Sequence, residues 1–418
     1  MRKTATVRKT ATVRKNQERT QERTRRRADE SMTDQLRHQV ADDAAAAGGQ
    51  EGDGNPVPLR ARFVDRSNVS YPAVEEGAWP PVIIRKAEIA QEVERLSSLP
   101  RPADGRRASW IVHPLSDEPG LGLAPGIRVS LEVLLPGERT SPVRHNSSQV
   151  GFCIEGAGFT AVGGEKISFQ QYDVWCMPSL TTYFHENDTS ERHVRLVYSN
   201  APVLEKIRVH FVDEHPPEEP AGWNQGSDDI GEHPIAHVFA MREGGPLLMS
   251  YERLINPEVI EQHPIHWPWA EVKRELDKLT ALGPKYRGRR LYLLYNPATG
   301  RANGTTNSFF ATITIRPPGI VDRPHRHASA AINYFFAGSG WSRVAGRRYE
   351  WGAGDLMLTA PGWSIHNHAS NDEPVYELTI QDSPFHISND SLMWQEDLKN
   401  PPRLLGSQRG FETNRDGE

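Results

Sequence analysis

Two stretches near the C-terminal end decide the fold. Residues 323–340 read RPHRHASAAINYFFAGSG, and residues 360–371 read APGWSIHNHASN. Each contains a His-x-His pair, and side chains two residues apart in a β-strand face the same side. His325 and His327 therefore point into one interior, and His366, which follows a Pro-Gly-Trp turn, can add a third imidazole. We predict that these three residues bind a metal ion, because three neutral imidazoles leave coordination positions open, as a catalytic metal requires.

The same spacing occurs twice in the chain. In the second half, five residues separate Gly319 from His325, three separate His327 from Ala331, and six separate Ala331 from Gly338. The same offsets in the first half lead to Gly137, Val143, His145, Gln149 and Gly156. Further on, nearly the same offsets lead to Tyr172, Pro178 and Tyr183. The two halves superpose almost without gaps, which indicates an internal duplication.

The residue pattern around these positions is typical of an antiparallel β protein. Short runs rich in Val, Ile, Phe and Tyr alternate with Gly, Pro and Asp, for example RVSLEVLLPGE, EKISFQQYDVWCMP and FFATITIRPPG. We expect two helices, one over WPPVIIRKAEIAQEVERLSSL (79–99) and one from near Pro268 to before Gly283. With only two cysteines in the chain, Cys153 and Cys176, we expect buried free thiols.

These motifs resemble those of the cupins, in which two copies make a bicupin of two jelly-roll barrels. The segments HWPWAEVKREL and YNPATGRANGTTNSFFATITIRPPG, followed by the two histidine motifs, are similar to the gentisate 1,2-dioxygenase family, which includes salicylate and 1-hydroxy-2-naphthoate dioxygenases. The resemblance covers roughly residues 60 to 400. It implies an all-β fold of two jelly-roll barrels with a partly helical connector.

We accordingly predict five segments. Residues 1–55, with tandem RKTATV and QERT repeats, form a disordered basic and low-complexity tail. Residues 56–215 form an N-terminal cupin with a degenerate metal site, and residues 216–300 form the connector with its helix. Residues 301–400 form a C-terminal cupin with an intact histidine triad, and residues 401–418 form a flexible tail. For the N-terminal repeats, the favoured explanation is that translation starts at Met32.

The resemblance also implies the chemistry. The usual fourth cupin ligand, Glu, is replaced here by Ala331, and the family likewise lacks that Glu. The implied cofactor is Fe(II), although imidazole also accepts other divalent metals. The implied reaction is ring cleavage of an aromatic carboxylic acid by dioxygen, between the hydroxyl-bearing and the carboxyl-bearing carbons. Relatives are commonly dimers or tetramers, so we expect a homo-oligomer.

Further residues are candidates for contacts to the ligands or to the substrate. His368 is expected to be a hydrogen-bonding group beside the ligands or a surface residue, since it lies one strand repeat from His366. Trp363 can line an aromatic pocket or simply pack in the barrel. Arg343 is a candidate partner for a substrate carboxylate, and Asn333 is a further candidate contact.

The first half departs from the family pattern. The family's iron usually sits in the first barrel, but here Val143 and Tyr183 replace two of its histidines. The residues that remain, His145, Gln149 and His185, form at most a weak and unusual site. We therefore place the metal in the second barrel and read the first as retained for packing.

Composition restricts the class of protein. The net charge of −5 argues against binding to nucleic acid or to a membrane surface, and no apolar run approaches the length of a membrane span. The N-terminus lacks the apolar centre of a signal peptide, so we expect a cytoplasmic protein. Two alternatives to a dioxygenase fit the same residues: a metal-binding cupin of other chemistry, such as an isomerase or hydrolase, and a non-enzymatic bicupin that binds a small molecule.

Overall fold

The computed structural model describes residues 78–217, 235–283 and 290–409, together with residues 61, 63–65 and 67. The chain divides into two units, residues 1–71 and 72–418, and the elements below belong to the second unit. The predicted tail of residues 1–55 lies outside the described residues. In the described part of the chain, no helix is both long and apolar enough to cross a membrane.

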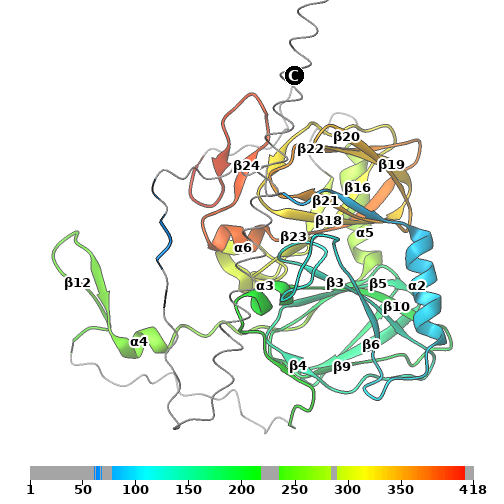
Figure 1. Ribbon diagram of the computed structural model, residues 1–418, viewed down its shortest axis with the longest axis horizontal. Coiled ribbons are helices and arrows are strands. Elements are labelled where there is room, and N and C mark those ends of the chain that lie inside the picture. Colours follow the sequence, from blue (N-terminus) through cyan, green and yellow to red (C-terminus); the bar gives the residue numbers. More distant parts are fainter. Residues whose placement is uncertain are drawn as a thin grey trace, which may run out of the picture. The chain divides into compact units, whose positions relative to one another are not determined.

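The first barrel is built from two antiparallel sheets and a short ribbon (Figure 1). The larger sheet has the order β14-β8-β5-β10-β3-β2, the smaller sheet the order β7-β6-β9, and the ribbon joins β11 to β4. The strands are β2 (Arg107–Ile111), β3 (Arg128–Leu134), β4 (Arg144–His145), β5 (Gln149–Glu155), β6 (Ala157–Val162), β7 (Glu165–Gln170), β8 (Val174–Met177), β9 (Tyr183–Glu186), β10 (His193–Ser199), β11 (Val212–Asp213) and β14 (Ile265–Trp267).

The second barrel repeats this plan. Its larger sheet has the order β1-β21-β18-β23-β16-β15, its smaller sheet the order β20-β19-β22, and a three-stranded ribbon has the order β17-β24-β25. The strands are β1 (Val82–Ile84), β15 (Leu291–Leu293), β16 (Phe310–Arg316), β17 (Arg326–His327), β18 (Ala330–Ala337), β19 (Ser339–Val344), β20 (Arg347–Gly352), β21 (Leu356–Pro361), β22 (His366–Ser370), β23 (Val375–Gln381), β24 (Met393–Gln395) and β25 (Arg403–Leu404). The predicted duplication of an all-β barrel is therefore confirmed.

The remaining elements are helices and one hairpin. They are α2 (Lys86–Ser98), α3 (Ala201–Lys206), α4 (Tyr251–Ile255), α5 (Trp269–Ala281), α6 (Ser383–Ser388), the 3₁₀ helix η2 (Pro297–Ala302), and the hairpin of β12 (Val238–Ala240) and β13 (Leu247–Met249). The helix expected near Pro268 is α5, which begins one residue after that proline. The expectation of one helix over residues 79–99 is wrong in its first part, because Val82–Ile84 is strand β1 and the helix begins only after Arg85.

The sheets do not follow the boundaries expected from the sequence. Strand β1, from the predicted N-terminal cupin, pairs with β21 of the second barrel, and β14, from the predicted connector, pairs with β8 of the first. In the expected tail of residues 401–418, Arg403–Leu404 forms β25 and pairs with β24. The division into domains stays a prediction, but each barrel includes an edge strand that comes from outside the sequence segment predicted for it.

Strand alternation creates two kinds of interior. On β5, Val150 and Phe152 join a large apolar core, whereas Cys153 joins a separate cluster with Trp175. The large core also contains Tyr334 and Phe336 of β18, and the ring centroid of Phe152 lies 5.7 and 5.6 Å from theirs. One face of each larger sheet thus packs in this shared core, and the opposite face is left to line a barrel interior. Both cysteines are free and buried, as expected.

Candidate metal centre

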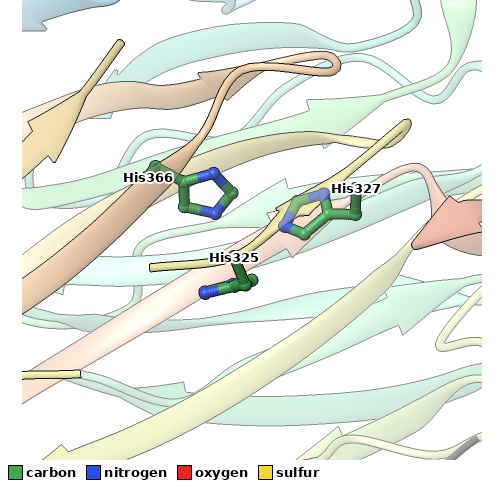
Figure 2. A group of neighbouring side chains, drawn as sticks. All are labelled: His325, His327 and His366. Carbon is green, nitrogen blue, oxygen red and sulfur yellow. The ribbon is translucent and has the colours of Figure 1, made fainter. Parts of the chain in front are cut away.

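The three predicted ligands come together in the second barrel. His325 precedes β17, His327 ends it, and His366 begins β22 (Figure 2). A β-bridge joins His325 to His366, with backbone N–H to carbonyl distances of 3.0 and 2.9 Å in the two directions. All three side chains are buried, and one ligand nitrogen from each lies within 4.8 Å of the others. It is the one group of three such ligands found among the described residues.

Backbone carbonyls fix the tautomer of each ligand. The Nδ1 atom of His325 lies 3.1 Å from the Arg323 carbonyl, that of His327 lies 2.8 Å from the Ser329 carbonyl, and that of His366 lies 2.9 Å from the Ser364 carbonyl. A carbonyl only accepts hydrogen bonds, so each Nδ1 carries the proton and donates it. The lone pair is then on Nε2, which is the usual arrangement for imidazoles that bind a metal.

The donor set fits a divalent transition metal. Nitrogen ligands bind at about 2.1 Å, so two neighbouring nitrogens on a tetrahedral ion lie about 3.4 Å apart. The imidazole nitrogens lie within 4.8 Å of one another, so the most widely separated rings must move together by about an ångström or more to share one ion. Ala331, at the position of the usual glutamate, is buried and brings no charge to the site. An ion held there would keep its full positive charge for an anionic ligand.

An aromatic side chain that sequence analysis missed packs on the ligands. Trp394 of β24 pairs in register with His327. Its ring centroid lies 4.6 Å from that of His327 and 6.0 Å from that of His325. The indole Nε1–H donates to Glu396 at 2.8 Å, which holds the ring in place. The only sequence signal was the short Met-Trp-Gln run, which gives no sign of pairing with residues nearly seventy positions earlier.

His368 lies two residues after His366 on the same strand, and its Nδ1 contacts a side-chain hydroxyl where that of His366 contacts a backbone carbonyl. Its Nδ1 lies 2.9 Å from the Ser342 hydroxyl, and that hydroxyl accepts the Trp351 indole N–H at 2.9 Å. A serine hydroxyl can accept two hydrogen bonds and donate one, so these contacts are compatible with either neutral tautomer of His368. The ring centroids of His366 and His368 are 5.8 Å apart. His368 is buried, and it places a potential proton donor beside the ligand set.

Three other candidates take different places. Asn333 is buried in the interior, where its amide donates to Thr379 at 2.8 Å and its carbonyl accepts from Thr359 at 2.8 Å. Trp363 packs under the guanidinium of Arg326, which is 4.5 Å from its ring centroid. Because Arg326 alternates with the two histidines, its side chain leaves the strand on the other face. Trp363 therefore packs behind the ligands.

The expectation for Arg343 is wrong. Its neighbours Ser342 and Val344 are buried, so Arg343 points outward from β19 and is exposed. Its guanidinium lies 5.9 Å from the ring centroid of Trp341, on the same outer face. Arg347 and Arg348 are exposed as well. The arginines of this hairpin thus provide no inward contact for a substrate carboxylate.

The first barrel keeps the backbone of the site without its ligands. Val143 and Tyr183 form the same β-bridge as His325 and His366. The Nδ1 of His145 lies 3.0 Å from the Ser147 carbonyl, but its Nε2 lies 2.9 Å from the Tyr183 hydroxyl. The weak site expected from His145, Gln149 and His185 is therefore not formed as a ligand set, because the Tyr183 hydroxyl forms a hydrogen bond with His145 Nε2, the nitrogen that would bind a metal. Burial lowers the pKa of His145 to about 4 and raises that of Tyr183 to about 12.

Known proteins similar to this chain show which family it belongs to. Residues 310–394 match the model of the AraC-like ligand binding domain. A 5-nitrosalicylic acid 1,2-dioxygenase from Bradyrhizobium sp. is 30% identical over 145 residues, which are 32% of this chain and 68% of that protein. The chain belongs to the gentisate, salicylate and 1-hydroxy-2-naphthoate dioxygenase family.

Longer but more distant matches extend the family relation over both barrels. A 5-aminosalicylate 1,2-dioxygenase from Comamonas sp. is 26% identical over 266 residues, which cover 62% of this chain and 66% of that enzyme. The crystal structure of a salicylate 1,2-dioxygenase from Pseudaminobacter salicylatoxidans superposes with a TM-score of 0.61 at 17% identity, covering 81% of this chain and 93% of that one. This family member thus shares the two-barrel fold of that dioxygenase.

Proposed function

We propose that the chain is an Fe(II)-dependent, extradiol-type dioxygenase that opens the ring of a hydroxylated aromatic carboxylic acid, and that it does so in the second barrel. The buried triad of His325, His327 and His366 carries the proposal, because its three Nδ1–H groups are engaged by backbone carbonyls and one ligand nitrogen from each ring lies within 4.8 Å of the others. Relatives named for 5-aminosalicylate and 5-nitrosalicylic acid supply the substrate class. Bound Fe(II) would supply the redox chemistry that dioxygen needs to react with a closed-shell ring.

The charge of the ligand set favours such a substrate. Three neutral imidazoles leave the charge of a divalent ion uncompensated, and a 2-hydroxybenzoate offers a carboxylate and a phenolic oxygen for it. The described interior of this barrel has another arginine, Arg316, but Glu377 and Asp322 already neutralise it with contacts of 3.1 Å. The negative charge of the substrate would therefore be compensated by the metal ion at the triad and not by Arg316.

Two further groups are assigned supporting roles. His368 is assigned the tautomer with its proton on Nε2, from which it donates a hydrogen bond to an oxygen of the substrate bound beside His366. Trp394 packs on two of the ligand rings and limits the access of water to that side of the site. Asn333, with its two threonine partners, fixes the polar interior below the ligands.

We also propose a cytoplasmic homo-oligomer. The segment 235–260 exposes large apolar side chains, among them Ile235, Met241, Leu247, Leu254 and Ile260. Apolar side chains concentrated in one segment in this way are typical of a surface that a partner covers. Sedimentation of the full chain at several concentrations tests this assignment.

One experiment separates the function from its alternatives. The full chain is purified anaerobically after growth with iron, and metal content and dioxygen uptake are measured with salicylate, gentisate, 5-aminosalicylate and 1-hydroxy-2-naphthoate. We expect about one iron per chain and uptake with at least one acid, and loss of both in His325→Ala/His327→Ala. The matched control is Arg343→Ala, whose side chain is exposed.

Other outcomes overturn parts of the proposal. Iron retained by the double variant would place the site elsewhere. Metal without uptake would favour an isomerase or hydrolase. A chain that binds no metal in either form would instead be a small-molecule-binding bicupin.

A further inference from the structure

The interior of the first barrel contains a buried arginine that its surroundings do not satisfy. Arg195 on β10 is only 1% exposed. Its Nη2 atom lies 2.5 Å from a carboxylate oxygen of Glu132, but its Nε and Nη1 atoms have no hydrogen-bond partner in the described part of the chain. A guanidinium carries five N–H donors, so at least three of them, one on Nε and two on Nη1, are unsatisfied. Burial makes each such donor costly.

Two more unsatisfied donors lie on the same interior. His193 precedes Arg195 by two residues and therefore shares its face of β10, and neither of its ring nitrogens has a partner among the described residues. The Trp175 indole N–H on β8 is also without a partner there. The ring of Phe169 joins the two, with centroids 4.8 Å from His193 and 4.0 Å from Trp175.

Strand pairing places Arg195 and Trp175 close to each other. Arg195 lies opposite Cys153 of β5, and Gly151, two residues earlier on β5, lies opposite Trp175. A side chain at Gly151 would collide with the indole, since an added Cβ would come within 2.4 Å of that ring. The absence of a side chain at Gly151 therefore lets the indole lie across β5, on the face where Arg195 also lies.

The balance of donors and charges points to an anion. Among the described residues of this interior, Gln149 Oε1 is the one atom without a partner that can only accept a hydrogen bond. Donors without a partner among the same residues lie on Arg195, His193 and Trp175, so donors are in excess. Arg195 and the half-buried Arg106 both act on His185 through their positive charge, and Arg195 forms an ion pair with Glu132. The charge of Arg195 adds to burial in holding the pKa values of His185 and His193 well below their usual range, so these rings are neutral.

The second barrel has no equivalent. The position of Arg195 on β10 corresponds to Glu377 on β23, which bonds to Arg316 at 3.1 Å through both carboxylate oxygens. Val375 stands where His193 stands in the first barrel. No unsatisfied buried side-chain atom falls on the strands of the second barrel, as far as its described residues go. The first barrel therefore lacks the imidazole triad, and it contains an arginine whose Nε and Nη1 donors have no partner among the described residues.

We propose that the interior of the first barrel binds a small carboxylate anion, held by Arg195 and completed by donors from His193 and Trp175. A carboxylate has two oxygens that accept several N–H groups in one plane, which matches a guanidinium. Binding would give the buried N–H donors the acceptors that they lack. This site requires no metal, and it is independent of the reaction proposed for the second barrel.

Calorimetric titration of the full chain tests the site. The probes are sodium formate and sodium benzoate, with sodium chloride at equal ionic strength. Benzoate lacks the phenolic oxygen that chelation at the metal requires. We expect the Kd for at least one carboxylate to rise by about tenfold or more in Arg195→Gln, and less in Arg195→Lys, which keeps the charge. It should not change in Arg343→Gln or in His325→Ala/His327→Ala.

Three results would overturn the proposal. The first is that neither carboxylate binds, the second is an unchanged Kd in the Arg195 variants, and the third is chloride binding as tightly as the carboxylates. If Arg195→Gln does not fold, the melting temperature of the unmodified chain decides. Stabilisation by formate beyond that by chloride supports the site, and equal effects refute it.

Discussion

His325 and His366 form a β-bridge whose two backbone hydrogen bonds measure 3.0 and 2.9 Å, and Val143 and Tyr183 form the same bridge at 3.0 and 2.9 Å in the first barrel. The third ligand, His327, also has a counterpart, since His145 Nδ1 faces the Ser147 carbonyl as His327 Nδ1 faces that of Ser329. At these positions the barrels therefore differ in side chains and share their backbone.

The shared backbone predicts that a metal site can be restored. In a His325→Ala/His327→Ala background, Val143→His with Tyr183→His places three imidazoles around one point and removes the hydroxyl that closes His145 Nε2. We expect metal content to rise from none to about one divalent ion per chain, with weaker affinity than in the second barrel because Arg195 repels cations. Elemental analysis measures this, and a variant that folds but stays metal-free would show that the first interior excludes cations.

His368 and Arg343 should behave in opposite ways. His368→Gln removes the Nε2–H donor beside His366, so we expect dioxygen uptake to fall by about a hundredfold with iron content unchanged. Arg343→Gln changes an exposed side chain and should alter neither quantity. Ser342→Ala removes the hydroxyl that contacts His368 Nδ1 and helps to hold the ring, and should give an intermediate loss. Loss of iron in His368→Gln would instead assign this residue to metal retention.

The sequence predicted those features that depend on local spacing. Two imidazoles at i and i+2 face one interior of any strand, so the pairing of His325 with His327 followed from the strand alone. The face of the strand on which Arg343 lies could not be assigned from the sequence. Side chains alternate between the two faces, so one buried residue of the strand must be known before the others can be assigned, and only the fold identifies it. Strand β1 was missed because its three residues pair with a strand 270 positions later, and the helix that follows shares its apolar composition.

Hydrogen bonds to the backbone were equally invisible in the sequence. The carbonyls of Arg323, Ser329 and Ser364 set the tautomers of the three ligands, and any residue type supplies a carbonyl. The unsatisfied donors of Arg195 follow from the pairing of β10 with β3 and β5, which no local pattern reveals. Spacing thus specified the ligands, and tertiary pairing specified everything that orients them.

Trp394 should govern how firmly the metal is held. Its ring packs on His327 and His325, so Trp394→Ala frees both imidazoles to leave their ligand positions. We expect the affinity for a divalent ion to fall by about 10- to 100-fold, as for other groups that orient ligands. Competition with a fluorescent chelator measures it, with Trp341→Ala as the control on the outer face. Equal affinities in the two variants would contradict this role.

The buried Arg316 should be required for stability. Arg316→Met leaves Glu377, which is 3% exposed, without its cation, and we expect unfolding to become easier by about 3–5 kcal/mol. Arg316→Met combined with Glu377→Leu removes both charges and should recover much of the loss. Arg348→Ala breaks an exposed pair with Glu350 and should cost less than about 1 kcal/mol. Urea unfolding gives all three values, and similar losses for Arg316→Met and the double variant would contradict the charge argument.

His145 should make stability depend on pH. Burial lowers its pKa from 6.5 to about 4, so between these values the unfolded chain binds a proton that the folded chain does not. Stability from this group is complete above pH 6.5 and is lost as the pH falls towards 4. For metal-free protein, we expect the unfolding free energy of wild type to drop between pH 7.5 and 4.5 by about 2–3 kcal/mol more than that of His145→Gln. His263→Gln, at an exposed histidine, should keep the wild-type slope. Equal slopes for wild type and His145→Gln would mean that His145 is protonated in the folded chain as readily as in the unfolded one.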